Sequence, residues 1–165
     1  MRRETVRSLP GMAQDEKMTR SPAFSDISGC SSRAMRALFS DVLEQSRNVR
    51  VVGTAANVIE ARTQIAELRP NVLTLDVEMP GMDGITAIAH IHEKQPDVRM
   101  LVLSMYDTVD FVKRAVANGA CGYLMKDAPP FELEQALRSV MATGSYFSPV
   151  IAQRLGYGGR QGSHP

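Results

Sequence analysis

Three polar side chains of different chemistry each stand at the end of a short apolar run. They are Asp76, Ser104 and Lys126. A carboxylate can attack a phosphoryl group to form an acyl phosphate, while an ammonium group neutralises the developing negative charge and a hydroxyl donates to a phosphoryl oxygen. A single polar residue at the end of a strand is common, but three after consecutive apolar runs indicate a site for phosphoryl chemistry.

The apolar runs that precede these residues predict β-strands. They do not alternate regularly between apolar and polar residues, which is typical of strands covered on both faces in a parallel sheet. The four runs are VRVVGTA at 49–55, NVLTLD at 71–76, VRMLVLS at 98–104 and CGYLMK at 121–126. Ligands of such sheets bind at the carboxyl ends of the strands, so we expect the three polar side chains to lie along one edge.

Stretches with apolar residues at helical spacing separate the predicted strands. Pro70, Pro96 and Gly119 each close such a stretch before the next strand. The alternation of helices and strands predicts a doubly wound α/β domain with right-handed crossovers and helices on both faces of the sheet. The helical stretches lie within 33–43, 59–68, 85–92, 109–116 and 131–140.

The composition predicts one soluble domain with extensions. The chain has 165 residues, 44% of them hydrophobic, and a net charge of +1, which gives no electrostatic reason to expect nucleic acid or a membrane as partner. We expect residues 1–25 to be a disordered or irregular extension, 26–155 to form the domain and 156–165 to be a flexible tail. Cys30 and Cys121 match no metal or redox spacing, consistent with a cytoplasmic protein.

The stretch LTLDVEMPGMDG at 73–84 resembles the phosphoacceptor segment of the response-regulator receiver domains of two-component systems. Residues 103–149 resemble the NarL/FixJ (LuxR-type) class of that family. The resemblance implies a flavodoxin-like fold, a role in transcription regulation, and a signalling domain that transfers a phosphoryl group only to itself rather than an enzyme.

The resemblance also implies a role for each candidate residue. Asp76 would accept a phosphoryl group from a sensor histidine kinase, and Lys126 would bind the phosphate. Ser104 would be the switch hydroxyl that moves towards the phosphoryl group, after which Tyr123 would turn inward. The acceptor loop comprises Pro80, Gly81, Asp83 and Gly84. Pro80 and Gly81 shape a tight turn, and Asp83 caps the next helix.

The metal site of the family is incomplete in this sequence. The family's first strand ends in two adjacent acidic residues that help to bind Mg²⁺, and alignment places Cys30 and Ser31 at those positions. The remaining ligands would be Asp76, the backbone carbonyl of Glu78 and, through an irregular loop, Asp26. Since Mg²⁺ needs hard oxygen ligands, we expect weak metal binding and slow phosphotransfer.

The first strand itself is atypical or missing. The segment SPAFSDISG at 21–29 has no run of apolar residues that would suit the centre of a sheet. Either these residues form a poor substitute strand, or the domain takes a strand from another molecule, or its stability is low. An altered reading frame at the start of the gene would also explain the segment.

Two main interpretations of the function follow. One is a phosphoryl-accepting receiver that could form a homodimer through residues 105–143; the other is a phosphorylation-independent pseudo-receiver that acts as a protein interaction module, which the absent acidic pair favours. An enzyme that binds a flavin or a nucleotide would need a Gly-rich loop after the first strand. Gly29 and the residues after it resemble such a loop only weakly. The receiver of a chemotaxis methylesterase fits less well. The ending GYGGRQGSHP contains no recognition helix, so we expect no direct DNA binding.

Overall fold

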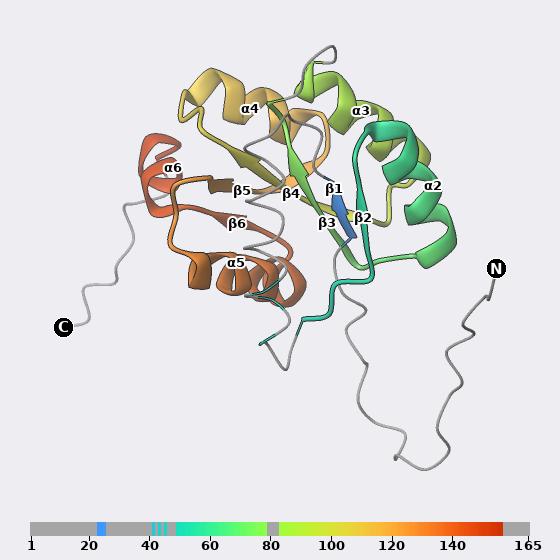
Figure 1. The fold of residues 1–165 in the computed structure, drawn as a ribbon. Coiled ribbons are helices and arrows are strands. Elements are labelled where there is room, and N and C mark those ends of the chain that lie inside the picture. Colours follow the sequence, from blue (N-terminus) through green and yellow to red (C-terminus); the bar gives the residue numbers. More distant parts are fainter. Residues whose placement is uncertain are drawn as a thin grey trace.

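The computed structural model describes residues 23–25, 41, 43, 45, 49–78 and 83–156. From residue 53 onward, strands and helices alternate along the chain (Figure 1). The strands are β1 (Ala23–Ser25), β2 (Gly53–Ala55), β3 (Val72–Asp76), β4 (Arg99–Ser104), β5 (Ala120–Met125) and β6 (Tyr146–Phe147). The helices are α2 (Val58–Leu68), α3 (Gly84–Lys94), α4 (Val109–Ala117), α5 (Pro130–Thr143) and α6 (Pro149–Arg154).

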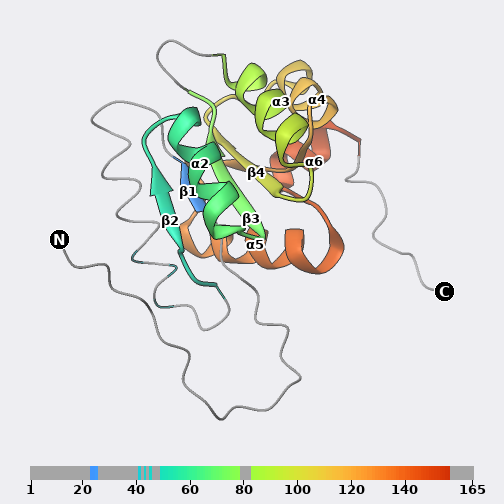
Figure 2. The ribbon, with the colours of Figure 1, turned by 90° about the vertical axis from the view of Figure 1, so that its right-hand side faces the viewer.

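The strands form one parallel sheet with the order β2-β1-β3-β4-β5-β6. Helix α5 lies on one side of this sheet, and α3 and α4 lie on the other (Figures 1 and 2). This arrangement confirms the predicted α/β fold with helices on both faces. Among the described residues, no helix is long and apolar enough to cross a membrane.

Two hydrophobic cores, one on each face, fix the sheet between the helices. In β4, Met100 and Val102 face the core under α2, α3 and α4, whereas Leu101 and Leu103 face the core under α5. Successive side chains of a strand point to opposite faces, so a strand buried on both sides needs apolar residues at every position. The absence of alternation in the sequence therefore has a structural cause.

Strand β1 is three residues long and lies between β2 and β3. Phe24 is the register partner of Thr54 on one side and of Thr74 on the other. Of the possibilities that the sequence left open for residues 21–29, the structure has the substitute strand. Its backbone joins β2 to the rest of the sheet.

The predicted strand at 49–55 is shorter in the structure, where β2 comprises only Gly53–Ala55. The reason is its neighbour: β2 pairs with β1 alone, and β1 offers three residues for pairing. Val49 and Val51 instead pack against the core under α5. These two apolar side chains are thus partly buried without a strand partner.

The short elements β6 and α6 follow α5 and were not predicted from the sequence. Strand β6 pairs with β5, and the backbone N–H of Ser148 donates to the carbonyl of Tyr123 at 2.9 Å. Ile151 of α6 is fully buried in the core under α4. Arg154 closes the segment with an ion pair of 2.6 Å to Asp107, which lies just before α4. The segment thus packs against both β5 and the start of α4.

The first turn of α3 requires a glycine because the backbone of Val77 lies against it. A Cβ atom at Gly84 would lie 2.6 Å from the carbonyl oxygen of Val77 and 2.8 Å from its Cα. We predict that Gly84→Ala lowers the free energy of unfolding by about 1–3 kcal/mol, measured by denaturant titration. Gly53→Ala is the control, since its Cβ would meet the ends of the flexible side chains of Gln64 and Leu68, which can move. Equal losses in the two variants would contradict this account.

Candidate functional site

The carboxyl edge of the sheet holds a buried ion pair between Asp76 and Lys126. Asp76 is the last residue of β3, and Lys126 follows the end of β5. Lys126 Nζ lies 2.7 Å from Asp76 Oδ2, and the two side chains are 12% and 7% exposed. Strand β4 separates β3 from β5, so the lysine side chain reaches across its end. Two of the three predicted residues are therefore in direct contact.

Ser104 ends β4, between the two members of this pair. Its neighbour Leu103 is the register partner of Asp76, and its own carbonyl accepts from the backbone N–H of Lys126 at 3.0 Å. The side chain is fully buried, and its Oγ accepts from the backbone N–H of Tyr106 at 2.9 Å. The third residue therefore lies on the predicted edge, with its hydroxyl oxygen bonded to the segment that follows it.

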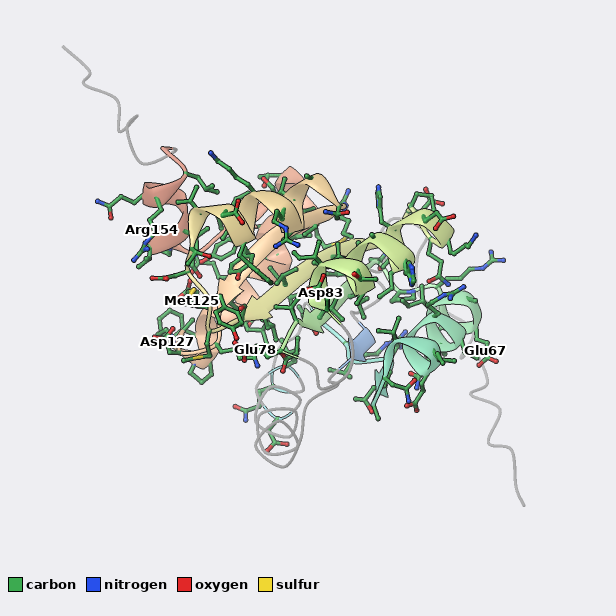
Figure 3. The ribbon with its side chains drawn as sticks, turned by 90° about the horizontal axis from the view of Figure 1, so that it is seen from above. Glu67, Glu78, Asp83, Met125, Asp127 and Arg154 are labelled. Carbon is green, nitrogen blue, oxygen red and sulfur yellow. The ribbon has the colours of Figure 1, made fainter. Side chains whose placement is uncertain are left out.

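The carboxylate of Glu78 is a further member of the site. Its Oε2 lies 2.5 Å from Lys126 Nζ, and its Oε1 accepts from the backbone N–H of Met105 at 2.9 Å. Figure 3 shows Glu78 beside Met125 and Asp127, the residues on either side of that lysine. The backbone N–H of Glu78 also donates to Asp76 Oδ1 at 2.8 Å.

Only the backbone carbonyl of Glu78 was expected at the site from the sequence, and its side chain was missed. A signal was available, because residues two apart in an extended segment point to the same side. Asp76 and Glu78 are two apart, so both carboxylates face Lys126. That spacing would have predicted Glu78 as a second acidic partner of Lys126.

The electrostatics of the site depend on Lys126, whose ammonium group is shared by the carboxylates of Asp76 and Glu78. Burial lowers the pKa of Lys126, but its hydrogen bonds and charge interactions with Asp76 and Glu78 outweigh burial and raise that pKa above the usual value. The ammonium group is therefore charged at neutral pH. Two carboxylates face one ammonium group, which leaves a net negative charge for a cation to neutralise.

Tyr123 lies inside the protein, next to this edge. Its side chain is fully buried, its hydroxyl donates to the carbonyl of Tyr106 at 2.6 Å, and its ring meets that of Phe111 edge-on at 6.4 Å between centroids. The pKa of Tyr123 is raised to about 12, chiefly by burial; a hydrogen bond with Ser104 lowers it, and the charges of Glu78 and Asp107 add to the rise. The aromatic ring thus occupies the inward position that the resemblance associates with the switched state.

The acceptor loop is described only in part. Asp83 is the N-cap of α3, the role that the sequence predicts: its Oδ2 accepts from the backbone N–H of Thr86 at 3.3 Å and from the Thr86 hydroxyl at 3.1 Å. Residues 79–82, which include Pro80 and Gly81, lie outside the described residues, as does Asp26.

Among the described residues, the oxygen atoms at this edge that could bind Mg²⁺ include those of Asp76 and the backbone carbonyl of Glu78. They are of the hard type that Mg²⁺ prefers. Both carboxylate oxygens of Asp76, however, already contact protein donors. The described part of the chain contains no group of three or more His, Cys, Asp and Glu residues suited to a metal ion. By their chemical type, the donors present fit Mg²⁺.

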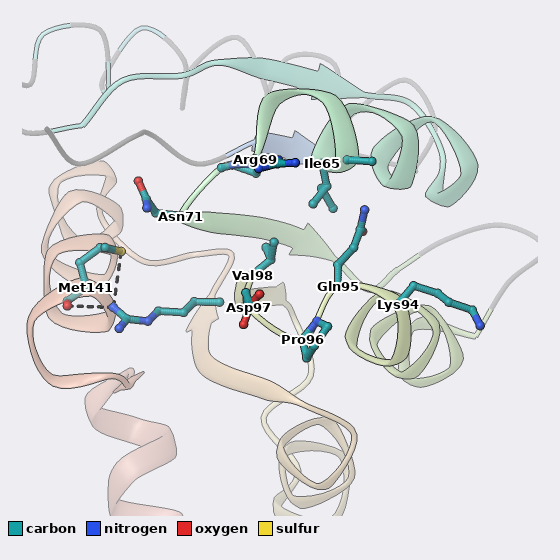
Figure 4. Close-up of a pocket in the computed structure, with 12 residues that line it drawn as sticks. Ile65, Arg69, Asn71, Lys94, Gln95, Pro96, Asp97, Val98 and Met141 are labelled. Atoms are coloured by element: carbon teal, nitrogen blue, oxygen red, sulfur yellow. Dashed lines mark hydrogen bonds between the residues drawn. The ribbon is translucent and has the colours of Figure 1, made fainter. Parts of the chain in front are cut away.

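A hollow of about 610 Å³ lies at the opposite edge of the sheet (Figure 4). Asn71, just before β3, and Arg99, at the start of β4, contribute to its lining, so it lies at the amino ends of the strands. Arg99 is engaged there by the end of α5, because its Nη1 donates to the carbonyl of Met141 at 2.8 Å. This hollow is therefore separate from the edge that carries Asp76, where the candidate chemistry lies.

Comparisons with known proteins agree with this geometry. Residues 31–138 match the family model of the response regulator receiver domain. The oxygen regulatory protein NreC of Staphylococcus carnosus is 36% identical over 122 residues, which are 73% of this chain and 56% of that relative. The chain thus spans little more than half the length of this curated relative.

Two solved structures have a similar fold. A LuxR-family two-component response regulator from Aurantimonas sp. SI85-9A1 has a TM-score of 0.76 at 29% identity, over 84% of this chain and 96% of that one. The signal receiver domain of the response regulator NarL from Mycobacterium tuberculosis has a TM-score of 0.65 at 30% identity, over 73% of this chain and 94% of that one.

The raised pKa of Tyr123 makes a prediction about stability at high pH. Because the folded protein binds the phenol proton more tightly than the unfolded chain, the contribution of Tyr123 is fully present below pH 10 and lost as pH rises towards about 12. Tyr123→Phe should reduce the fall in the free energy of unfolding over this range, measured by denaturant titrations at several pH values. Tyr106→Phe, at a side chain that is 55% exposed, is the control. A pH dependence unchanged by Tyr123→Phe would show that burial does not perturb this group.

Proposed function

The chain belongs to the response regulator receiver domain family, and on this premise we propose that Asp76 accepts a phosphoryl group from a sensor histidine kinase. The family match and the NreC and LuxR-family similarities confirm the resemblance found in residues 73–84 and 103–149. Receiver domains of this family act in two-component signalling and are not enzymes in the usual sense. The contact of 2.7 Å between Asp76 and Lys126 carries the proposal.

The proposed reaction is a direct transfer between two side chains. A carboxylate oxygen of Asp76 attacks phosphorus, a new P–O bond forms, and the P–N bond to the kinase histidine breaks with its electron pair returning to the imidazole. Lys126 is charged and already lies beside Asp76, so it would neutralise negative charge on the phosphoryl oxygens. The exclusion of water from the buried pair strengthens that interaction.

Mg²⁺ is the proposed cofactor. Asp76 and the backbone carbonyl of Glu78 would bind it, and Asp26 is a third proposed ligand outside the described residues. Bound Mg²⁺ would neutralise charge on the phosphoryl oxygens. We expect weak affinity, because Cys30 and Ser31 align with the usual acidic pair.

The proposed switch follows from hydrogen bonds around Ser104. Movement of its side chain towards a phosphoryl oxygen on Asp76 would let the hydroxyl donate to that oxygen and would lengthen the bond that its oxygen accepts from the backbone N–H of Tyr106. Tyr106 also supplies the carbonyl that accepts from Tyr123. Since Tyr123 already lies inward in this structure, a phosphoryl group on Asp76 would act on the segment that carries its hydrogen-bond partner, and not by turning the ring inward.

We further propose residues 105–143 as the surface that transmits the signal, with a homodimer as one form of the output. Large apolar side chains are exposed along this range, including Tyr106 at 55% and Phe131 at 69%. Apolar groups of this size on a surface suit contact with another protein. A role in transcription regulation and a cytoplasmic location are proposed from the family.

The proposed function predicts phosphorylation at one residue. The wild-type chain incubated with acetyl phosphate and Mg²⁺ should gain the mass of one phosphoryl group, and Asp76→Ala should gain none, measured by intact-protein mass spectrometry. Asp127→Ala, which removes an exposed carboxylate next to Lys126, is the control and should still gain it. If the wild-type chain gains no mass at high donor concentration, Asp76 is not a phosphoacceptor and an interaction module that works without phosphorylation becomes the better account.

A further inference from the structure

The side chain of Glu78 contacts two donors that come from different strand ends. Its Oε2 is paired with Lys126 Nζ at 2.5 Å, and its Oε1 accepts from the backbone N–H of Met105 at 2.9 Å. Both donors border Asp76, since Lys126 contacts it directly and Met105 follows Ser104 at the end of β4. The Glu78 side chain is 25% exposed, so water does not fully screen these contacts.

A carboxylate and a phosphoryl group accept hydrogen bonds from the same kinds of donor. Each presents negatively charged oxygens that bind best to ammonium groups and to backbone N–H groups. A phosphoryl group on Asp76 would carry three such oxygens, and two donors at this edge of the sheet, Lys126 and the N–H of Met105, are now bonded to Glu78. The single N–H of Met105 cannot serve Glu78 and the phosphoryl group fully at the same time. Lys126 has three N–H donors and already contacts Asp76 and Glu78, so its positive charge would be shared between Glu78 and the phosphoryl oxygens.

We propose that the Glu78 carboxylate competes with the phosphoryl group for Lys126 and the N–H of Met105. Glu78 must give up these two contacts before Asp76 can be stably phosphorylated. This inference rests on the proposed function of Asp76. Glu78 opposes the reaction in two ways: it occupies Lys126, and its negative charge repels an incoming phosphoryl donor in a partly buried site. Glu78 therefore sets the rate at which this receiver accepts phosphate.

The displacement of Glu78 would also reach the switch. Its bond to Met105 fixes the first residue of the segment 105–108, which joins β4 to α4. The next residue, Tyr106, donates to Ser104 and accepts from Tyr123. When the carboxylate leaves, Met105 becomes available to the phosphoryl group, and the segment that carries the partner of Tyr123 is released from Glu78.

The test compares rates of phosphorylation in variants of the whole chain. Glu78→Gln removes the charge and the ion pair, and Glu78→Ala also removes the acceptor for Met105, while both keep the backbone carbonyl proposed as a Mg²⁺ ligand. With acetyl phosphate and Mg²⁺, we expect both variants to be phosphorylated about tenfold faster than the wild type, the size expected when a charge-assisted hydrogen bond no longer competes. Initial rates come from intact-protein mass spectrometry.

Asp127→Asn is the matched control. It removes the same charge one residue from Lys126, at an exposed side chain, so its rate should stay within about twofold of the wild type. A rate increase in Asp127→Asn equal to that in Glu78→Gln would show a general charge effect and overturn the inference.

A second measurement needs no phosphodonor. Amide hydrogen exchange at Met105 should be faster in Glu78→Ala than in the wild type, because the N–H loses its acceptor, while exchange within α5 should be unchanged. Equal or slower phosphorylation of the Glu78 variants would overturn the inference and leave the proposed function intact. If neither the wild type nor any variant is phosphorylated, the proposed function of Asp76 and the inference about Glu78 are both wrong.

Discussion

The buried contact between Asp76 and Lys126 is the constraint on which the site depends. A carboxylate that is 7% exposed would lose much of its hydration, so it requires a charged partner. The partner comes from beyond a neighbouring strand, so the pair forms only when β3, β4 and β5 are aligned as parallel neighbours with their carboxyl ends level. The same alignment places Ser104 between the two. The apolar cores on both faces maintain this register, and through it they maintain the geometry that phosphoryl transfer needs.

Lys126 also connects the acceptor to the rest of the molecule, because Glu78 shares it. Glu78 in turn contacts Met105, and the following residue contacts Ser104 and Tyr123. Charge at the acceptor is thereby linked through hydrogen bonds to a buried aromatic ring on β5. The elements β6 and α6 pack against this region, since Ser148 bonds to the carbonyl of Tyr123 and Arg154 pairs with Asp107. A change at Asp76 therefore has a short physical path to the C-terminal part of the domain.

The sequence predicted those features that short stretches encode. The apolar runs ending at Asp76, Ser104 and Lys126 mark buried strands, and their shared edge follows from the rule for parallel sheets. It left β1 as one of several possibilities for residues 21–29, because Ala23–Ser25 has no pattern of its own and pairs only where two other strands supply partners. The two-residue strand β6 was missed for the same reason, since it depends on β5. The two-residue spacing of Asp76 and Glu78 suggests that both carboxylates face the same side. It does not establish the contact of Glu78 with Lys126, which depends on the tertiary structure.

The most direct test of the central ion pair is a double-mutant cycle between Asp76 and Lys126, measured by chemical denaturation. The cycle uses Asp76→Ala, Lys126→Met and the double variant in a Glu78→Gln background, so that the lysine has no second carboxylate to contact. The account predicts a favourable coupling free energy of at least about 1 kcal/mol, as expected for residues in direct contact. Additive losses, with no coupling between the two positions, would show that Asp76 and Lys126 do not form the pair on which the site depends.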